Sequence, residues 1–183
     1  MNGILISAAH KSSGKTTVAI GISAALRDQK YNVQSFKKGP DYIDPMWLSA
    51  ASGRPCYNLD FYTMSAEEIT NMFAAKAGLA DRVVVEGNKG LFDGLDLRGG
   101  DSNAALAELL ELQVLLVIDT VGMTRGIAPL ILGYSSFSPE LDILGVVLNK
   151  VGGTRHETKL RRSIEHYTDV PVIGALNYDK DLA

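Results

Sequence analysis

The chain has 183 residues, of which 46% are hydrophobic and 21% charged, and its formal net charge is −3. This composition is typical of a globular protein with one substantial core, and it argues against nucleic acid or a membrane surface as partner. The longest strongly apolar run, 114–118, is too short to cross a bilayer, and the N-terminus lacks the pattern of a signal peptide. The single cysteine, Cys56, excludes an internal disulfide and fits a reducing compartment, so we expect a cytoplasmic protein.

Six short apolar runs predict strands. They are Ile4–Ala8, Val33–Phe36, Arg82–Glu86, Val114–Asp119, Leu144–Asn149 and Val170–Gly174. Most of these runs are continuous rather than alternating, which is typical of strands buried on both faces of a parallel sheet. The chain contains no internal repeat, low-complexity tract or linker, so we expect a single domain over residues 1–183.

Helical patterns separate the predicted strands. Ser65–Glu68 and Thr154–Glu157 each match a capping box, and Asp101 or Ser102 can cap a helix that follows. Alternating strands and helices predict an α/β fold in which a doubly wound, mostly parallel sheet carries helices on both faces, with right-handed crossovers.

The segment between the first strand and the helix after it predicts a P-loop. Its pattern is close to G-x-x-x-x-G-K-[ST], with Ala9 at the position of the first glycine. Backbone N–H groups at a helix start attract phosphate, and the helix dipole adds to that attraction. Gly14 allows close approach of the backbone, Lys15 reaches the β/γ oxygens, and the Thr16 hydroxyl can ligate Mg²⁺. The expected nucleotide-binding residues of the loop are Ser12, Ser13, Gly14, Lys15, Thr16 and Thr17.

Polar side chains follow the other predicted strands, at the sheet edge where ligands bind in such folds. Asp41 and Glu86 are the candidate Mg²⁺ ligands beside Thr16, because Mg²⁺ commonly takes one or two carboxylates together with phosphate oxygens. Asp119 ends an equally apolar strand and competes with Glu86 for this role, in second place.

Five further positions are candidates for a functional role. Lys37 and Lys38 follow the second predicted strand and can neutralise transferring phosphate charge, or can be a solvated lysine pair. Asn149 can hydrogen-bond an adenine edge or can be a turn residue. Asp44 and Asp93 lie beyond the metal candidates and suit the handling of a substrate or intermediate.

Several of these motifs together resemble the cobyrinic acid a,c-diamide synthase family. The resemblance covers essentially the whole chain in the same order, and its segments are 37–47, 53–60, 85–94, 145–152 with 155–156, and 170–174. Gly-Pro-Asp-Tyr-Ile-Asp-Pro at 39–45 is the most specific of them. The resemblance implies a P-loop ATPase domain related to dethiobiotin synthetase, which the family joins to a class I glutamine amidotransferase domain.

The resemblance also implies a reaction. ATP phosphorylates side-chain carboxylates of a corrin-type tetrapyrrole, the a- and c-carboxylates of cobyrinic acid, and ammonia then displaces the phosphate to leave an amide. By motif, Asp41 and Glu86 would hold Mg²⁺. Tyr42, Asp44 and Asp93 would handle the carboxylate and the acyl phosphate, and Lys15 and Lys37 would stabilise the transferring phosphoryl group.

Two departures from the family pattern shape the expectations. Nothing in the chain resembles the amidotransferase Cys-His pair, so we expect a truncated piece or a separate synthetase subunit that needs an amidotransferase domain or subunit as partner. The segments 86–90 and 122–126 are closer to a branch that amidates sirohaem-type tetrapyrroles.

Other classes also stay open. A MinD-type nucleotide-switch ATPase is one alternative, although Lys11 lies one position away from the extra lysine of that group. A dethiobiotin synthetase-like carboxylase is another. Whether the protein forms a homodimer is likewise open.

Overall fold

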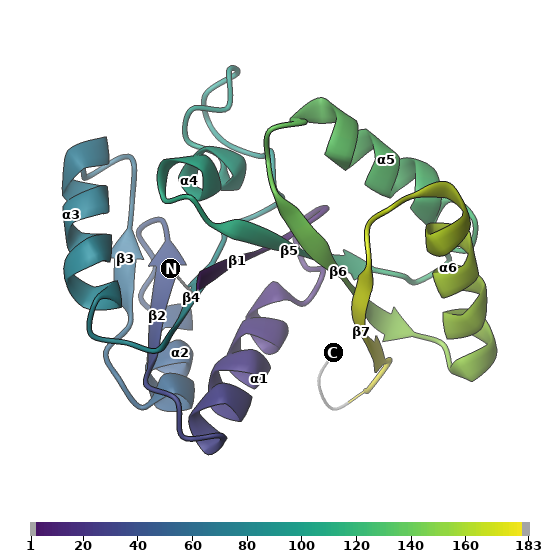
Figure 1. The fold of residues 1–183 in the computed structure, drawn as a ribbon, viewed down its shortest axis with the longest axis horizontal. Coiled ribbons are helices and arrows are strands. Elements are labelled where there is room, and N and C mark those ends of the chain that lie inside the picture. Colours follow the sequence, from purple (N-terminus) through teal and green to yellow (C-terminus); the bar gives the residue numbers. More distant parts are fainter. Residues whose placement is uncertain (1–2, 181–183) are drawn as a thin grey trace.

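The computed structural model describes residues 3–180 (Figure 1). The strands are β1 Gly3–Ala8, β2 Val33–Lys38, β3 Tyr57–Leu59, β4 Arg82–Glu86, β5 Gln113–Asp119, β6 Ile143–Val151 and β7 Val172–Asn177. The helices are α1 Lys15–Asp28, α2 Asp44–Ser52, α3 Ala66–Ala77, α4 Asn103–Leu109, α5 Ile127–Phe137 and α6 Thr154–Tyr167. Strand and helix alternate along the whole described chain, as predicted.

The strands form one seven-stranded sheet in the order β3-β2-β4-β1-β5-β6-β7, and every neighbouring pair is parallel. The predicted doubly wound sheet is therefore confirmed, and among residues 3–180 it is parallel throughout rather than mostly parallel. Because all strands run the same way, their carboxyl ends meet at one edge. In register, Ile6 of β1 lies opposite Glu86 of β4, and Ala8 lies opposite Val117 of β5.

The sheet separates two apolar cores. Alternate residues of each strand enter opposite cores, as the two-residue period of a strand requires: Val84 packs on one side, and Val83 and Val85 on the other. Helices α1 and α2 cover the first core, and α3, α4, α5 and α6 cover the second (Figure 1). Each side chain at the carboxyl edge of the sheet therefore lies either on the face covered by α1 and α2 or on the face covered by α3 to α6.

The helix starts follow local chemistry, with one exception to our predictions. Ser65 and Glu68 form the predicted capping box of α3, and the Ser102 hydroxyl accepts the N–H of Ala105 to cap α4. The capping box predicted at Thr154–Glu157 is wrong. Thr154 is already inside α6, and Gly153, with φ 99°, is the N-cap and has no side chain to accept a hydrogen bond.

Strand ends also differ from the prediction. The second strand runs two residues further, so Lys37 and Lys38 lie inside β2 rather than after it. The last strand begins at Val172, after Pro171, and continues to Asn177. The three-residue β3 and helix α2, with proline in its first turn, were not predicted. No helix within 3–180 is long and apolar enough to cross a membrane.

Candidate nucleotide-binding and carboxylate-activating site

The loop between β1 and α1 has the geometry of an anion-binding helix start. Gly14 is the N-cap of α1 with φ 90°, and no side chain caps the helix. The first helical hydrogen bond runs from the N–H of Val18 to the carbonyl of Gly14 at 3.1 Å. The N–H groups of residues 15–17 precede it and therefore have no acceptor within the helix. Such a helix start suits phosphate.

Asn149, which lies in β6 two residues before the strand ends at Val151, is hydrogen-bonded to this loop. Its Nδ2 donates to the carbonyl of Ser13 at 2.9 Å. A Cβ placed on Gly14 would lie 2.1 Å from the same Nδ2, so only glycine fits there, on steric grounds as well as by its φ. The amide of Asn149 thus fixes the P-loop from a neighbouring strand, and its role toward adenine stays a prediction.

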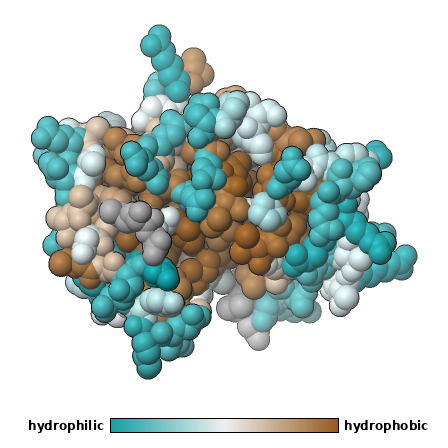
Figure 2. Space-filling model, viewed as in Figure 1, coloured by the Kyte–Doolittle hydropathy of each residue, from teal (hydrophilic) through white to brown (hydrophobic). Residues whose placement is uncertain are grey.

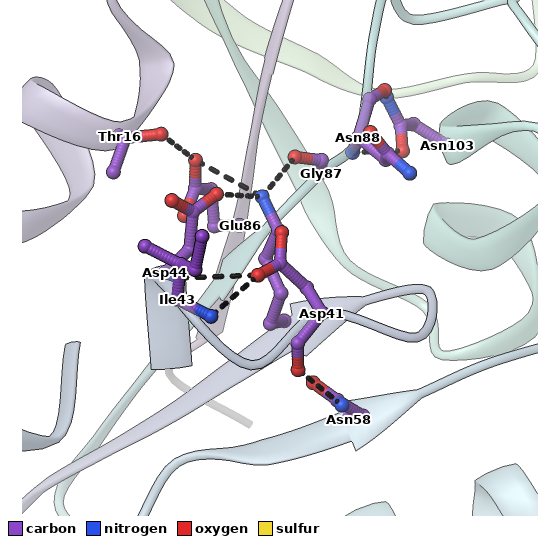
Figure 3. A network of polar contacts seen from close by, with 10 residues as sticks. Thr16, Asp41, Ile43, Asp44, Asn58, Glu86, Gly87, Asn88 and Asn103 are labelled. Carbon is purple, nitrogen blue, oxygen red and sulfur yellow. Dashed lines mark hydrogen bonds and ion pairs between the residues drawn. The ribbon is translucent and has the colours of Figure 1, made fainter. Parts of the chain in front are cut away.

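Two lysines of the site, Lys15 and Lys37, are buried. Lys15 is only 8% exposed to solvent, and Lys37 only 3%. Burial lowers the pKa of Lys15, and the nearby charge of Lys37 lowers it further. The Lys37 Nζ lies 2.7 Å from Asp44 Oδ2 and 3.2 Å from Glu86 Oε1. It also donates to the carbonyl of Gly87 at 3.2 Å. Figure 3 shows these three partners converging on one ammonium group.

Glu86 is the carboxylate that faces the P-loop. The hydroxyl of Thr16 donates to its Oε1 (Figure 3), and its Oε2 is buried with no hydrogen-bond partner in the described part of the chain. Burial raises the pKa of Glu86, against the lowering effects of Lys37 and the Thr16 hydroxyl. An orphaned carboxylate oxygen beside a P-loop hydroxyl fits a hard divalent cation. Within residues 3–180, no three His, Cys, Asp or Glu side chains lie together in a group that could hold a metal ion by themselves. Phosphate and water would therefore supply the remaining ligands of Mg²⁺.

Asp119, the competing carboxylate, is engaged elsewhere. Its Oδ2 lies 2.8 Å from the Nζ of Lys150, and its Oδ1 accepts the N–H of Val121 at 3.0 Å. Partial burial raises the pKa of Asp119, but the hydrogen bonds from Lys150 and Val121 outweigh it, and the net shift is downward. The geometry therefore favours Glu86 over Asp119.

Asp41 and Tyr42 occupy less direct positions. The Oδ1 of Asp41 accepts the N–H groups of Ile43 and Asp44 at 2.9 and 3.1 Å, so this carboxylate caps the start of α2 (Figure 3). The carbonyl of Asp41 accepts a hydrogen bond from Asn58 at 2.6 Å. Tyr42 is 79% exposed. The Asp41 carboxylate is thus engaged in capping α2, and its role as a metal ligand stays a prediction.

The loop after β4 carries Asp93 and is held by a residue that sequence reasoning missed. Asn103, the first residue of α4, is fully buried. Its Oδ1 accepts the N–H of Asn88 at 2.9 Å (Figure 3), and its Nδ2 donates to the carbonyl of Gly90 at 2.9 Å. The Oδ2 of Asp93 in turn accepts the N–H of Gly90 at 2.9 Å. Nothing in the local sequence distinguishes Asn103 from an ordinary residue at the start of a helix.

Lys38 points away from the phosphate site. Neighbouring residues of a strand face opposite sides, and Phe36 packs in the core beneath α3 and α4. Lys38 lies on that same side, with its Nζ 5.9 Å from the ring centroid of Phe61. The interpretation of Lys37 and Lys38 as a solvated lysine pair is wrong, because both residues are buried, and Lys38 lies on the opposite side of the sheet from Lys37.

A large groove adjoins the P-loop on the α1 side. It has a volume of about 990 Å³ and passes from the loop between α1 and strands β5, β6 and β7. Its polar end includes Lys15, Thr16 and Asn149, and its apolar end includes Ile22 and Ile173. Figure 2 shows apolar side chains gathered across the middle of this face, between hydrophilic margins. A nucleoside fits such a mixed groove, with the phosphates at its polar end.

Sequence comparison identifies the family. Residues 4–183 match the family described as the CobQ/CobB/MinD/ParA nucleotide binding domain. The chain belongs to this family. Members that resemble it include a cobyrinate a,c-diamide synthase of Magnetococcus marinus, 49% identical over 94% of this chain and 37% of that protein. Another, from Methanosarcina acetivorans, is 44% identical over 98% of this chain and 37% of that protein. The chain thus spans little more than a third of the length of these relatives.

Solved structures of this nucleotide-binding fold agree in architecture. The septum site-determining protein MinD of Pyrococcus horikoshii, solved with Mg-ADP, has a TM-score of 0.60 at 17% identity, over 97% of this chain and 82% of that one. Chloroplast FtsY of Physcomitrella patens has a TM-score of 0.62 at 16% identity, over 99% of this chain and 60% of that one. At such identities the likeness shows the fold alone.

Proposed function

We propose that this nucleotide-binding domain activates side-chain carboxylates of a corrin-type tetrapyrrole for amidation, with ATP as phosphoryl donor. The observation that carries the proposal is the arrangement around Lys37. Its ammonium joins Glu86, on the P-loop side, to Asp44 at the start of α2. The relatives named cobyrinate a,c-diamide synthase match nearly all of the chain and supply the substrate class.

The reaction needs two displacements. A carboxylate is a poor electrophile at neutral pH, so its oxygen first attacks the γ-phosphorus of ATP, and ADP leaves. Ammonia then attacks the acyl carbon, phosphate leaves with the bonding electrons, and the ammonium proton passes to solvent. The task of the protein in both steps is positioning and charge stabilisation.

The residues divide this task by position. The N–H groups of residues 15–17 and the Lys15 ammonium would hold the β/γ-phosphates, with Ser12 and Ser13 completing the loop. Thr16 and Glu86 would hold Mg²⁺, which when bound neutralises phosphate charge. Lys37 sits between Glu86 and Asp44 and would stabilise the transferring group. Tyr42, Asp44 and Asp93 would orient the incoming carboxylate, and Asp41 stays a further candidate ligand of Mg²⁺.

The ammonia would come from glutamine through an amidotransferase domain or subunit. That proposal rests on the family resemblance and on the length of the relatives. Free ammonia replaces such a partner in a simple assay, because an amine nucleophile can attack an acyl phosphate directly.

The test combines the chain with Mg-ATP, ammonium chloride and cobyrinic acid, and follows by mass spectrometry the replacement of OH by NH₂. We expect up to two such replacements, with ADP formed in equal number. Sirohaem in a parallel reaction distinguishes the two tetrapyrrole branches. ATP hydrolysis that neither macrocycle stimulates, with no amide formed, would overturn the proposal.

A further inference from the structure

A second cavity lies at the carboxyl edge of the sheet, on the side of α3 and α4. Its volume is about 370 Å³, and its walls include Lys38, Phe61, Tyr62, Lys89, Asp93 and Leu95. The loop that carries Asp93 links this cavity to the phosphate site, because the N–H of Leu91 in that loop donates to the carbonyl of Ala8 at the end of β1 at 2.8 Å, and Asp93 itself lines the cavity. A substrate held near Asp93 can therefore reach both places.

Lys38 is a buried cation without an ion pair. The residue is 8% exposed, and within residues 3–180 no carboxylate oxygen lies within 4.0 Å of its Nζ. Its contact is with the face of Phe61. Burial lowers the pKa of Lys38, and the more distant charges of Asp101 and Asp60 oppose that effect. A desolvated ammonium group facing a cavity favours an anionic ligand.

The three carboxylates of the cavity wall are already used to hold loops. Asp60 accepts the N–H of Tyr62 at 3.1 Å and the hydroxyl of Thr63 at 3.0 Å. Asp101 accepts the N–H groups of Leu95 and Asp96 at 2.8 and 3.1 Å, and these bonds lower the pKa of Asp101. Asp93 accepts the N–H of Gly90. None of them forms an ion pair with Lys38.

We propose that this cavity is a second carboxylate subsite, in which Lys38 binds a carboxylate arm of the substrate other than the arm being activated. The inference rests on the proposed function, because only a substrate with several carboxylates can occupy both places. The rings of Phe61 and Tyr62 and the side chain of Leu95 offer an apolar wall to the methylene groups of such an arm. Lys89, exposed at the same cavity, adds a second positive charge. Anchoring a neighbouring arm would select both the macrocycle and its orientation.

The test compares Lys38→Met with Lys76→Met. Lys76 is the matched control, because its Nζ also lies over a ring, 4.6 Å from the centroid of Tyr57, but away from the cavity. Binding of cobyrinic acid is followed through the corrin absorbance, and ATP affinity by calorimetry. We expect the dissociation constant of cobyrinic acid to rise about tenfold or more in Lys38→Met alone, as the loss of a charge-assisted hydrogen bond implies. ATP affinity should be unchanged in both variants.

A second measurement tests the Lys38 subsite independently of whether a corrin is the substrate. Lysines of the wild-type chain are reductively methylated with ¹³C, which keeps their charge, and propionate is titrated while the resonances are followed by NMR. The Lys38 resonance, assigned by its absence from Lys38→Met, should shift saturably, and that of Lys76 should not. If cobyrinic acid does not bind the wild type but propionate shifts Lys38, the proposed substrate is wrong and the subsite stands. If cobyrinic acid binds both variants equally, or propionate leaves Lys38 unmoved, the subsite is wrong.

Discussion

Asn103 in α4 donates a hydrogen bond from its Nδ2 to the Oγ of Ser7 in β1 at 2.9 Å, across 96 positions of the chain. Together with its bonds to the loop at 88–90, this contact ties the loop between Glu86 and Asp93 to the central strand. A Cβ at Gly87 would lie 2.7 Å from the Asn103 Cγ, so the backbone approaches the amide closely. Asn103 is therefore a positioning residue for two proposed active-site carboxylates.

Replacing Asn103 by alanine should lower the free energy of unfolding by about 2–4 kcal/mol, since several buried polar groups would lose their partner at once. Urea denaturation measures this change. Asn71→Ala, on an exposed position of α3, is the control and should change stability by about 0.5 kcal/mol at most. A loss under about 1 kcal/mol for Asn103→Ala would contradict the role of this residue.

Much of this architecture was predictable because it depends on local pattern. Continuous apolar runs marked six of the seven strands, and the P-loop motif placed Lys15 and Thr16. The three-residue β3 was missed because it is too short to show a period. Asn103 was missed because its function depends on contacts with Ser7 and Asn88, which sequence spacing does not reveal.

The sequence placed Glu86 ahead of Asp119 without a physical ground that separates the two. Both residues end apolar strands, and only their three-dimensional partners differ: the Thr16 hydroxyl for Glu86, and the Lys150 ammonium for Asp119. Whether Lys37 and Lys38 face the same side of the sheet depended on where β2 ends. Once β2 extends through both lysines, strand alternation sends them to opposite sides of the sheet.

Glu86→Gln should remove most of the effect of Mg²⁺ on nucleotide affinity. In the wild type, we expect Mg²⁺ to tighten ATP binding, because Glu86 and Thr16 provide oxygen ligands beside the phosphates. The ATP affinity of the variant in the presence of Mg²⁺ should be about tenfold weaker than that of the wild type, with little change in the affinity measured in EDTA. Calorimetry with and without Mg²⁺ gives both values. Asp119→Asn is the matched control, and a larger effect there than in Glu86→Gln would assign the metal to Asp119 instead.

Glu86 should also leave a signature in the pH dependence of stability. The pKa of Glu86 in the folded protein is raised above its ordinary value of 4.5, chiefly by burial. Between 4.5 and the raised value the folded state binds more protons than the unfolded state, so this group makes stability fall as pH rises through that interval. Glu86→Gln cannot titrate, and its stability relative to the wild type should therefore increase as pH rises from 4.5 toward neutral. Urea denaturation at a series of pH values tests this, and a constant difference would contradict it.

Lys15→Met should abolish ATP binding while stabilising the free protein. Burial and the nearby charge of Lys37 both lower the pKa of Lys15. The charge of Lys15 is therefore unfavourable in the folded state without a phosphate ligand. We expect the free energy of unfolding to rise by up to about 1 kcal/mol in the absence of nucleotide. The exposed Lys11 in the same loop provides the control, since Lys11→Met should alter neither property. Thermal unfolding and calorimetry report the two changes, and a variant that is less stable and still binds ATP would refute both expectations.

Glutamine should not support amide formation by this chain, whereas ammonia should. Hydrolysis of glutamine by a class I amidotransferase needs a cysteine thiolate, and Cys56 is the sole cysteine of the sequence. Burial, followed by the charge of Glu86, raises the pKa of Cys56 to about 12, so its thiol stays protonated at neutral pH. Free ammonia bypasses this step, and amidation at constant total ammonium should rise with pH as the neutral amine becomes more abundant.

The assay compares the two nitrogen sources with Mg-ATP and cobyrinic acid, and Cys56→Ser is its control. That variant should keep the ammonia-dependent rate of the wild type. Glutamine-dependent amidation that disappears in Cys56→Ser would assign the missing nucleophile to this chain and overturn the division of labour.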